Sequence, residues 1–421
     1  SIVEIDNAMR WGFAREVGIF DAWDAIGVEK SVNKMKEENR KVPAWVEQML
    51  ATGRKSFYEI KNGEMTYWCP VNKKPVVYKQ NKKVLNLNLY KNTKNTIKRD
   101  WSASIHDIGD GVLNVEFHSI FVPAFNPLDR SMNDIMKHAL DLLETGKYKG
   151  LVVGHQGKNW CAGANVNDFK MAIDSGNLQV MDAGVKEMQD VTQRIRHSKY
   201  PVVTCPFNLA LGGGFEFYAC SSHTVASGEL YAGLVEAIQG LIPGAGGHLR
   251  VLLNLLENND AKNVNMNIGR QAIQLINPLT VSRSATDALK KGWLRKSDTI
   301  AMNSEHLLAI GKSKVLEMSD AGYEPPKYRD DLTLPGMTLR TMASVGAKAM
   351  KAQGKISDHD ELVNSKSAYV LSGGDKGGLM SKVDEQHVLD IERECFMSLA
   401  GEPKTQARIT HFLKTGKPLR N

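Results

Sequence analysis

The middle of this chain is predicted to adopt an α/β fold, because short apolar strands alternate with amphipathic helices. Gly150–Val153 and Pro201–Cys205 are apolar runs with the length of a buried strand. Between them, Met181–Arg196 has the apolar spacing of a helix. Strands that are separated by helices need crossover connections, so the expected architecture is a sheet covered by helices.

The composition is that of a globular protein. The chain has 421 residues, of which 42% are hydrophobic and 24% are charged, and this length allows two or three domains. No run is long enough to span a membrane, and the start does not resemble a signal peptide. The five cysteines and eleven histidines lack the spacing of a disulfide framework or a metal site. We therefore expect no metal, free thiols and a cytoplasmic location.

Residues 1–70 are expected to form helices followed by a hairpin. Residues 1–53 show approximate helical spacing that is interrupted by glycines. Within Phe57–Trp68, Asn62-Gly63 separates two runs that are rich in β-forming residues. This arrangement is a strong hairpin signal.

Residues 71–100 are expected to be a basic linker. Nine lysines or arginines and no acidic residue occur between Val71 and Arg99, without helical periodicity. The alternative is a basic strip that attracts a phosphorylated ligand. Aromatic residues are too few here for a nucleic-acid stacking platform, and the net charge of +7 is mild. We therefore expect no nucleic-acid partner.

A new domain begins near Trp101, and its α/β core is expected over residues 101–256. Ser104–Asp107 and Gly111–His118 are predicted strands around a glycine-rich turn. A helical region is expected over residues 257–421. Its predicted helices are Ala261–Ile276, Ala285–Lys291, Glu305–Met318, Met337–Ala352, Asp358–Leu371, Asp384–Leu399 and Thr405–Lys414.

Two isolated glutamates are the candidates for acid/base chemistry. Glu216 is the only charged side chain between Pro201 and Gly228, and Glu236 is the only one between Glu229 and Arg250. Burial in an apolar environment raises the pKa of a carboxyl group toward working pH. Two such groups close together would have different pKa values, which suits an acid/base pair. Their spacing does not show that they meet, and Glu216 taken alone could equally face solvent.

Two turns that are rich in small residues could expose backbone N–H groups. Ala162–Ala164 lies in the loop Asn159–Phe169, which follows a predicted strand and opens a helix. Gly212–Gly214 lies in a second turn of this kind, directly before Glu216. Two N–H groups that point to one position form an oxyanion hole.

These segments resemble the crotonase superfamily, specifically the enoyl-CoA hydratases. That family shows an AGAD-like loop, an ALGGGxE motif and a PE…IPGAGG segment in this order. This sequence has CAGAN at Cys161–Asn165, ALGGGFE at Ala210–Glu216 and VEAIQGLIPGAGG at Val235–Gly247. The resemblance covers residues 101–256 and implies an α/β fold with a crotonase-like ββα spiral core.

The resemblance also implies roles for particular residues. The backbone N–H groups of Ala162 and Gly213 would bind the thioester oxygen, and Glu216 and Glu236 would handle water and proton. The loop that contains Ala162 would line the adenine side of coenzyme A, and one glycine would position the water. The expected substrate-binding residues are Gly163, Ala164, Asn165, Gly212 and Gly244.

Both glutamates are present, which resembles a hydratase. Such an enzyme adds water to trans-2-enoyl-CoA and gives 3-hydroxyacyl-CoA. The alternatives are a Δ3,Δ2-enoyl-CoA isomerase, which often keeps one glutamate, and a non-catalytic acyl-CoA-binding or assembly fragment. Three departures affect the coenzyme contacts: Asn165 replaces the usual Asp, Val235 replaces the usual Pro, and Val122–Leu128 lacks a lysine.

The N-terminal part resembles a second enzyme. Ile5–Lys30 is similar to the C-terminal helical domain of 3-hydroxyacyl-CoA dehydrogenases, and the C-terminal stretch resembles the tail of bifunctional dehydrogenase/hydratases of fatty-acid β-oxidation. This order implies the C-terminal portion of such a protein, with the NAD-binding domain upstream of Ser1. No GxGxxG follows a predicted strand, so we expect no cofactor in this chain. The expected partners are an acyl-CoA substrate and either further copies of the chain or the missing N-terminal domain.

Overall fold

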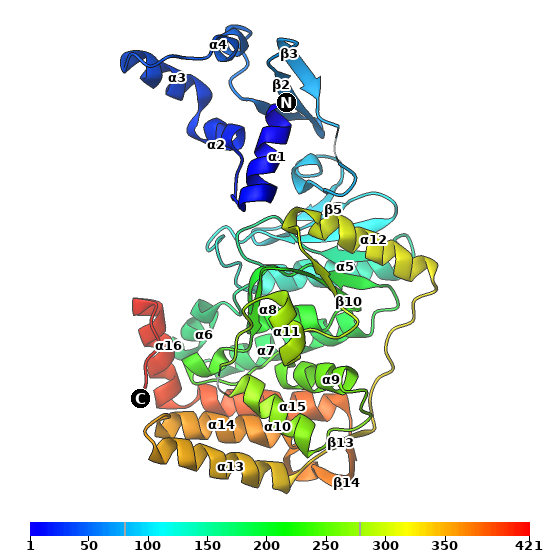
Figure 1. Cartoon of the computed structure of the whole chain (residues 1–421). Helices are drawn as coiled ribbons and strands as arrows, with labels where there is room; N and C mark the ends of the chain where they lie inside the picture. The colour runs from blue at the N-terminus through cyan, green and yellow to red at the C-terminus, as the bar shows by residue number, and fades with distance from the viewer. Residues whose placement is uncertain (80, 278) are drawn as a thin grey trace. The chain divides into compact units, whose positions relative to one another are not determined.

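The computed structural model describes residues 1–79, 81–277 and 279–421. It contains two compact units, unit 1 (residues 1–96) and unit 2 (residues 97–421) (Figure 1). In these described ranges, no helix is long and apolar enough to cross a membrane. Nor do three or more His, Cys, Asp or Glu side chains of the described chain gather in a group that could hold a metal ion.

Unit 1 consists of short helices followed by an antiparallel sheet: α1 (Ile2–Phe13), α2 (Ile19–Ile26), α3 (Val28–Glu37), α4 (Ala44–Ala51), β1 (Tyr58–Lys61), β2 (Glu64–Cys69) and β3 (Lys74–Val77). The expected hairpin is present, because Lys61 pairs with Glu64 around Asn62 and Gly63, whose φ angles are +53° and +78°. Strand β3 lies within the segment expected to be a linker and pairs with β2. That segment is therefore partly folded into unit 1.

Buried side-chain hydrogen bonds join the helices of unit 1 to its sheet. Asp6 has no exposed surface and accepts hydrogen bonds from the Phe20 N–H and the Tyr58 hydroxyl, both at 2.9 Å. Asp24 accepts hydrogen bonds from the N–H groups of Phe57 and Tyr58 at 2.6 and 2.9 Å. These carboxylates stabilise the fold because buried backbone donors need a partner.

A seven-stranded sheet forms the centre of unit 2, with the strands in the order β12 (Thr299–Ala301), β10 (His223–Ser227), β8 (Val202–Thr204), β7 (Gly150–Val153), β6 (Val112–Phe117), β5 (Ala103–Asp107) and β4 (Thr96–Arg99). The strands from β6 to β12 run parallel, and β5 is antiparallel to β6. The α/β prediction is confirmed. Strand β12 comes from the C-terminal region, which is helical as expected but also adds this short strand to the sheet.

A second, two-stranded sheet carries the glycine turn. Strand β9 (Asn208–Leu211) runs parallel to β11 (Leu230–Gly233). An isolated bridge also joins Ala210 of β9 to Cys161. Because β9 is followed at once by α8 (Gly213–Ala219), the CAGAN loop and the glycine triplet lie side by side.

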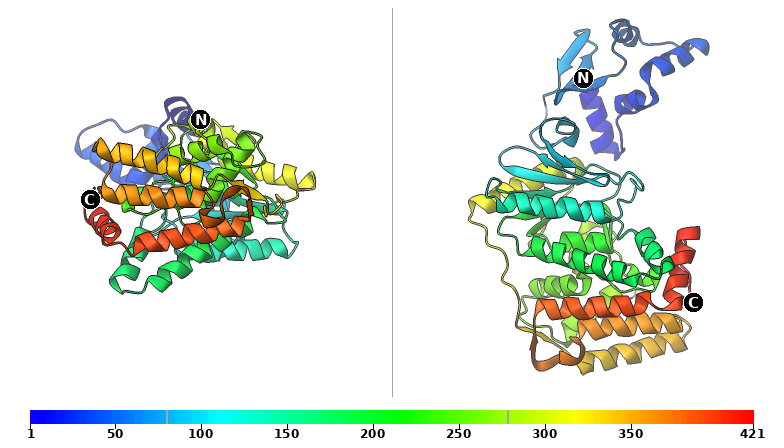
Figure 2. Two further views of the ribbon diagram at one scale, coloured as in Figure 1. Left: turned by 90° about the horizontal axis from the view of Figure 1, so that it is seen from below. Right: turned by 180° about the vertical axis from the view of Figure 1, so that it is seen from behind.

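The other helices of unit 2 are α5 (Arg130–Glu144), α6 (Val166–Asp174), α7 (Leu178–Arg196), α9 (Gly247–Asn258), α10 (Met266–Ile276), α11 (Ala285–Lys291), α12 (Leu307–Asp320), α13 (Met337–Ala352), α14 (Asp358–Leu371), α15 (Glu385–Ala400) and α16 (Pro403–Thr415). Helix α12 packs against β7, β8 and β10. Helices α13, α14 and α15 lie side by side, and α14 and α15 also contact α9 (Figure 2). The C-terminal helices therefore belong to the same compact unit as the core.

Candidate active site

The turn between β9 and α8 brings several of the predicted site residues together. Gly212 has a φ of +53°, which other residues rarely adopt. A Cβ atom at Gly212 would lie 3.0 Å from Oε1 of Glu236 and 3.6 Å from Cα of Gly163. A Cβ atom at Gly214 would lie 2.3 Å from the carbonyl oxygen of Cys161. Glycine at these positions therefore lets the turn approach both the CAGAN loop and the Glu236 carboxyl group.

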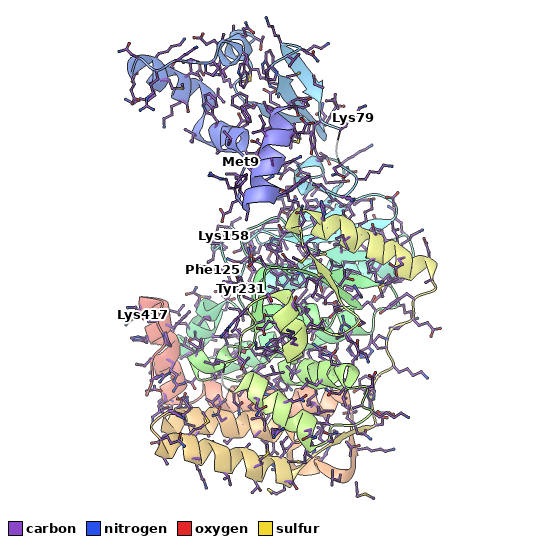
Figure 3. The ribbon with its side chains drawn as sticks, viewed as in Figure 1. Met9, Lys79, Phe125, Lys158, Tyr231 and Lys417 are labelled. Carbon is purple, nitrogen blue, oxygen red and sulfur yellow. The ribbon has the colours of Figure 1, made fainter. Side chains whose placement is uncertain are left out.

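The structure changes the assignment of one backbone donor. The N–H of Ala162 donates to the carbonyl oxygen of Phe125 at 2.9 Å, so it is already paired (Phe125 is labelled in Figure 3). The N–H groups of Ala164 and Gly213 have no acceptor within the described ranges. The nitrogen of Ala164 lies 3.5 Å from the position of a Cβ atom on Gly213. Ala164 therefore replaces Ala162 as the free donor beside Gly213.

A short backbone bridge explains the orientation of Ala164. Leu128 donates its N–H to the Gly163 carbonyl at 2.8 Å and accepts the Asn165 N–H at 2.9 Å. The Gly163 carbonyl and the Asn165 N–H, on either side of Ala164, thus point toward Leu128. Because N–H and C=O groups of an extended backbone point in alternating directions, the Ala164 N–H points away from Leu128.

Glu216 is a buried carboxyl group that is bound by a backbone turn. It lies on α8, and only 3% of its surface is exposed. Its Oε1 atom accepts the N–H groups of Ala245 and Gly247, each at 2.8 Å. These bonds favour the charged form, but burial and the nearby charges of Glu236 and Glu392 raise the pKa of Glu216 well above its usual range. Of the two alternatives that the sequence left open for Glu216, facing solvent or being buried, the structure shows the buried one.

Glu236 lies at the first position of the short 3-10 helix η2 (Glu236–Gln239). Its Oε2 atom is enclosed and has no hydrogen-bond partner within the described ranges. Burial raises the pKa of Glu236 to about 8, and the Glu392 charge adds to this effect. Since the Glu236 charge also raises the pKa of Glu216, the two carboxyl groups form an interacting pair.

A small cavity of about 10 Å³ adjoins Glu236. This volume is close to the space that one water molecule needs. Its lining comes from three parts of unit 2: Leu234–Ala237 and Leu241–Pro243 near the glutamate, the end of α10, and α14. The lining residues are Leu234, Glu236, Ala237, Leu241, Ile242, Pro243, Ile276, Asn277, Val363 and Ser367.

Two other predicted site residues have structural contacts of their own. The side chain of Asn165 caps α6 by accepting the Asn167 N–H at 3.2 Å. The carbonyl oxygen of Gly244 accepts a hydrogen bond from Gln189 at 2.9 Å, and a Cβ atom at Gly244 would lie 3.1 Å from the Phe396 ring. Gly244 thus allows close packing. A role for it in placing water stays a prediction.

A further carboxylate beside the site, the buried Glu392 of α15, was not predicted from the sequence. Glu392 has no exposed surface, and it interacts with the turn that binds Glu216. A signal was present in the sequence, because Glu392 lies three residues after Leu389 and four before Phe396. That spacing places it on the apolar face of the helix.

The pKa of Glu236 predicts a pH-dependent contribution to stability. The pKa rises from its ordinary value of 4.5 to about 8 on folding, so between these values the folded chain retains a proton that the unfolded chain has lost. The free energy of unfolding should therefore fall with rising pH, by roughly 1.4 kcal/mol per unit from this group. Urea unfolding between about pH 5 and 8 should show a shallower decrease in Glu236→Gln than in the wild type. The exposed Glu394→Gln should retain the wild-type slope, and an unchanged slope in Glu236→Gln would contradict the assignment.

This chain is similar to known proteins in sequence and in fold. Residues 122–258 match the enoyl-CoA hydratase/isomerase family. The fold is similar to that of a carnitinyl-CoA dehydratase from Mycobacterium thermoresistibile (TM-score 0.54, 14% identity, 76% of this chain and 91% of that chain). It is also similar to that of an enoyl-CoA hydratase from Rhodobacter sphaeroides 2.4.1 (TM-score 0.53, 16% identity, 76% of this chain and 92% of that chain). The chain therefore has the crotonase fold and contains a crotonase-family enoyl-CoA hydratase/isomerase domain.

The sequence similarity extends beyond this domain. A probable 3-hydroxyacyl-CoA dehydrogenase of Bacillus subtilis is 38% identical over 417 residues, which cover 99% of this chain and 51% of the relative. A putative fatty acid oxidation complex trifunctional enzyme of Rickettsia felis is 28% identical over 305 residues, or 72% of this chain and 38% of the relative. The chain is thus homologous to 3-hydroxyacyl-CoA dehydrogenases and fatty acid oxidation enzymes. It spans about half or less of the length of these curated relatives.

Proposed function

We propose that unit 2 hydrates trans-2-enoyl-CoA to 3-hydroxyacyl-CoA. The observation that carries this proposal is the convergence of two carboxyl groups, the buried Glu216 and the half-buried Glu236, beside the N–H groups of Ala164 and Gly213, which have no acceptor in the described part of the chain. One carboxyl group of the pair can remove a proton from water, and the other can donate a proton to a carbon atom of the substrate. The two N–H groups can donate hydrogen bonds that stabilise the negative charge developing on a thioester oxygen.

In this mechanism the N–H groups of Ala164 and Gly213 donate to the thioester oxygen and polarise the conjugated double bond. One carboxylate of the pair removes a proton from water as its oxygen bonds to Cβ. The other carboxyl group donates its proton to Cα, so the double bond becomes a single bond. The pair has then gained one proton from water and lost one to the substrate. Because Glu216 and Glu236 titrate as a coupled pair, the mechanism assigns the acid and base roles to the pair as a whole.

The chain with crotonyl-CoA provides the direct test. We expect the absorbance of the conjugated enoyl thioester to fall as 3-hydroxybutyryl-CoA forms. If crotonyl-CoA binds with no change in absorbance over long incubation, the proposal is wrong. That result would instead support a non-catalytic acyl-CoA-binding or assembly role.

A Δ3,Δ2-enoyl-CoA isomerase is the second candidate. The observation in its favour is Glu236, whose Oε2 atom is unpaired in the described part of the chain and whose Oε1 atom lies against the Gly212 turn. A single carboxyl group there could move a proton from Cα to Cγ of a 3-enoyl thioester. An assay with 3-enoyl-CoA distinguishes the two, because an isomerase should form the conjugated product and keep activity in Glu216→Gln.

We also propose that unit 1 belongs to the dehydrogenase part of a multifunctional β-oxidation enzyme. This proposal is supported by the similarity of nearly the whole chain to the Bacillus subtilis protein, which is about twice as long. NAD-dependent oxidation would then use residues that correspond to the half of the Bacillus subtilis protein outside this similarity. A preparation of this chain should bind no NAD, whereas the corresponding longer protein should.

A further inference from the structure

The turn at residues 245–248 is bound by two buried carboxyl groups in alternation. Glu216 accepts the N–H groups of Ala245 and Gly247. Glu392 accepts the N–H groups of Gly246 and His248 at 2.6 and 2.9 Å. The four successive N–H groups of residues 245–248 therefore point alternately to Glu216 and to Glu392, and each has a carboxylate acceptor. Because these donors share one turn, we expect a displacement of Glu392 to move the peptide groups that orient Glu216.

A chain of hydrogen bonds continues from Glu392 across the interior. Nδ1 of His248 lies 2.8 Å from Oε2 of Glu392, and Nε2 of His248 lies 2.9 Å from Oγ of Ser367. In the tautomer whose Nδ1–H donates to the carboxylate, Nε2 accepts a hydrogen bond from the Ser367 hydroxyl. The side chains of Glu392, His248 and Ser367 are at most 1% exposed. This series of hydrogen bonds is therefore shielded from solvent.

The far end of this hydrogen-bonded series lies at the cavity that Glu236 also lines. Ser367 on α14 and Glu236 on η2 line the same cavity of about 10 Å³. The Glu392–His248–Ser367 chain thus contacts the Glu216 turn at one end and the Glu236 cavity at the other. Residues from α9, α14 and α15 are needed to complete it.

We propose that Glu392, His248 and Ser367 form a positioning triad that fixes Glu216 through its backbone turn and connects this turn to the cavity beside Glu236. The inference rests on the proposed function of this site. None of the three side chains contacts the reacting atoms in this scheme. They act by holding the acid/base pair in place and by setting the charge around it.

The charges that face Glu392 come from four elements of unit 2. Glu216 on α8 and Glu236 on η2 are both influenced by the Glu392 charge, which raises their pKa values. On α9, Arg250 lies beside His248 and has its Nε atom 3.7 Å from the position of a Cβ atom on Gly246. On α15 itself, burial is the main cause of the raised pKa of Cys395, and the Glu392 charge adds to it. Removal of the Glu392 charge should therefore lower the pKa values of both catalytic carboxyl groups.

Two variants test the triad, each with a control on the same helix. Ser367→Ala should lower kcat for crotonyl-CoA hydration by roughly tenfold to a hundredfold with KM almost unchanged, because catalysis is sensitive to small displacements. Glu392→Gln should lower kcat and also shift both limbs of the pH profile of kcat/KM to lower pH. The exposed Ser365→Ala and Glu394→Gln should behave like the wild type. If Ser367→Ala has wild-type kcat, or if a folded Glu392→Gln keeps the wild-type pH profile, the proposal is wrong.

A second measurement separates this proposal from the proposed function. The nitrogen NMR signals of His248 in the ligand-free chain should show a protonated Nδ1 and an unprotonated Nε2 that accepts a hydrogen bond. Ser367→Ala should shift the Nε2 signal, whereas Ser365→Ala should not. An inactive wild type with this spectrum would overturn the hydratase assignment alone. A His248 that is protonated at Nε2 only would overturn the triad, whatever the activity.

Discussion

Glu236→Gln and Glu216→Gln are each expected to lower kcat for crotonyl-CoA hydration by about 10²–10⁴, the range typical of general acid–base catalysis. Glutamine keeps the size and one carbonyl oxygen of each side chain, so Oε1 at position 216 can still accept the N–H groups of Ala245 and Gly247 while proton transfer is lost. The measurement is the initial rate of absorbance loss at saturating substrate, with circular dichroism to show that each variant is folded.

The double variant separates a coupled pair from two independent groups. Residues that act as a unit are not additive, so Glu216→Gln/Glu236→Gln should be about as slow as the slower single variant. The exposed Glu394→Gln should retain full activity. Wild-type hydration activity in either single variant would contradict the paired mechanism. Activity toward 3-enoyl-CoA that survives in Glu216→Gln and is lost in Glu236→Gln would favour the isomerase.

Gly213→Pro is expected to lower kcat by about 10²–10³, the cost of losing one oxyanion donor. Proline has no N–H, yet it is tolerated at the first position of a helix, which Gly213 occupies in α8. The experiment measures kcat and KM for crotonyl-CoA together with the thermal unfolding midpoint.

Gly213→Ala is the matched control for this prediction. A Cβ atom at Gly213 would lie 2.9 Å from Cδ1 of Leu128, so both variants must displace the same flexible side-chain end. Alanine keeps the backbone N–H and should retain most of the activity. Equal losses in the two variants would show that crowding at Leu128, and not the N–H donor, limits catalysis.

Much of the fold was predictable because its signals are local. The strands β7 and β8 are short apolar runs, and the hairpin of unit 1 is set by Asn62-Gly63. Strand β12 was missed because its three residues, Thr299–Ala301, are too few to show a period. Its strand conformation depends on pairing with β10, which lies more than seventy residues earlier. Likewise, β3 is a strand because β2 is beside it.

The sequence by itself determined the chemistry of the site: two lone glutamates in apolar surroundings and glycines where the backbone must turn. Tertiary structure decided which atoms meet. Ala162 and Ala164 are equivalent in composition, but pairing of the loop with Leu128 and Phe125 leaves only the Ala164 N–H free. Glu392 reaches Gly246 across 146 residues, and no local spacing encodes such a contact. The physical reason is that residue types fix which bonds can form, whereas the packing of distant elements fixes which donors remain unpaired.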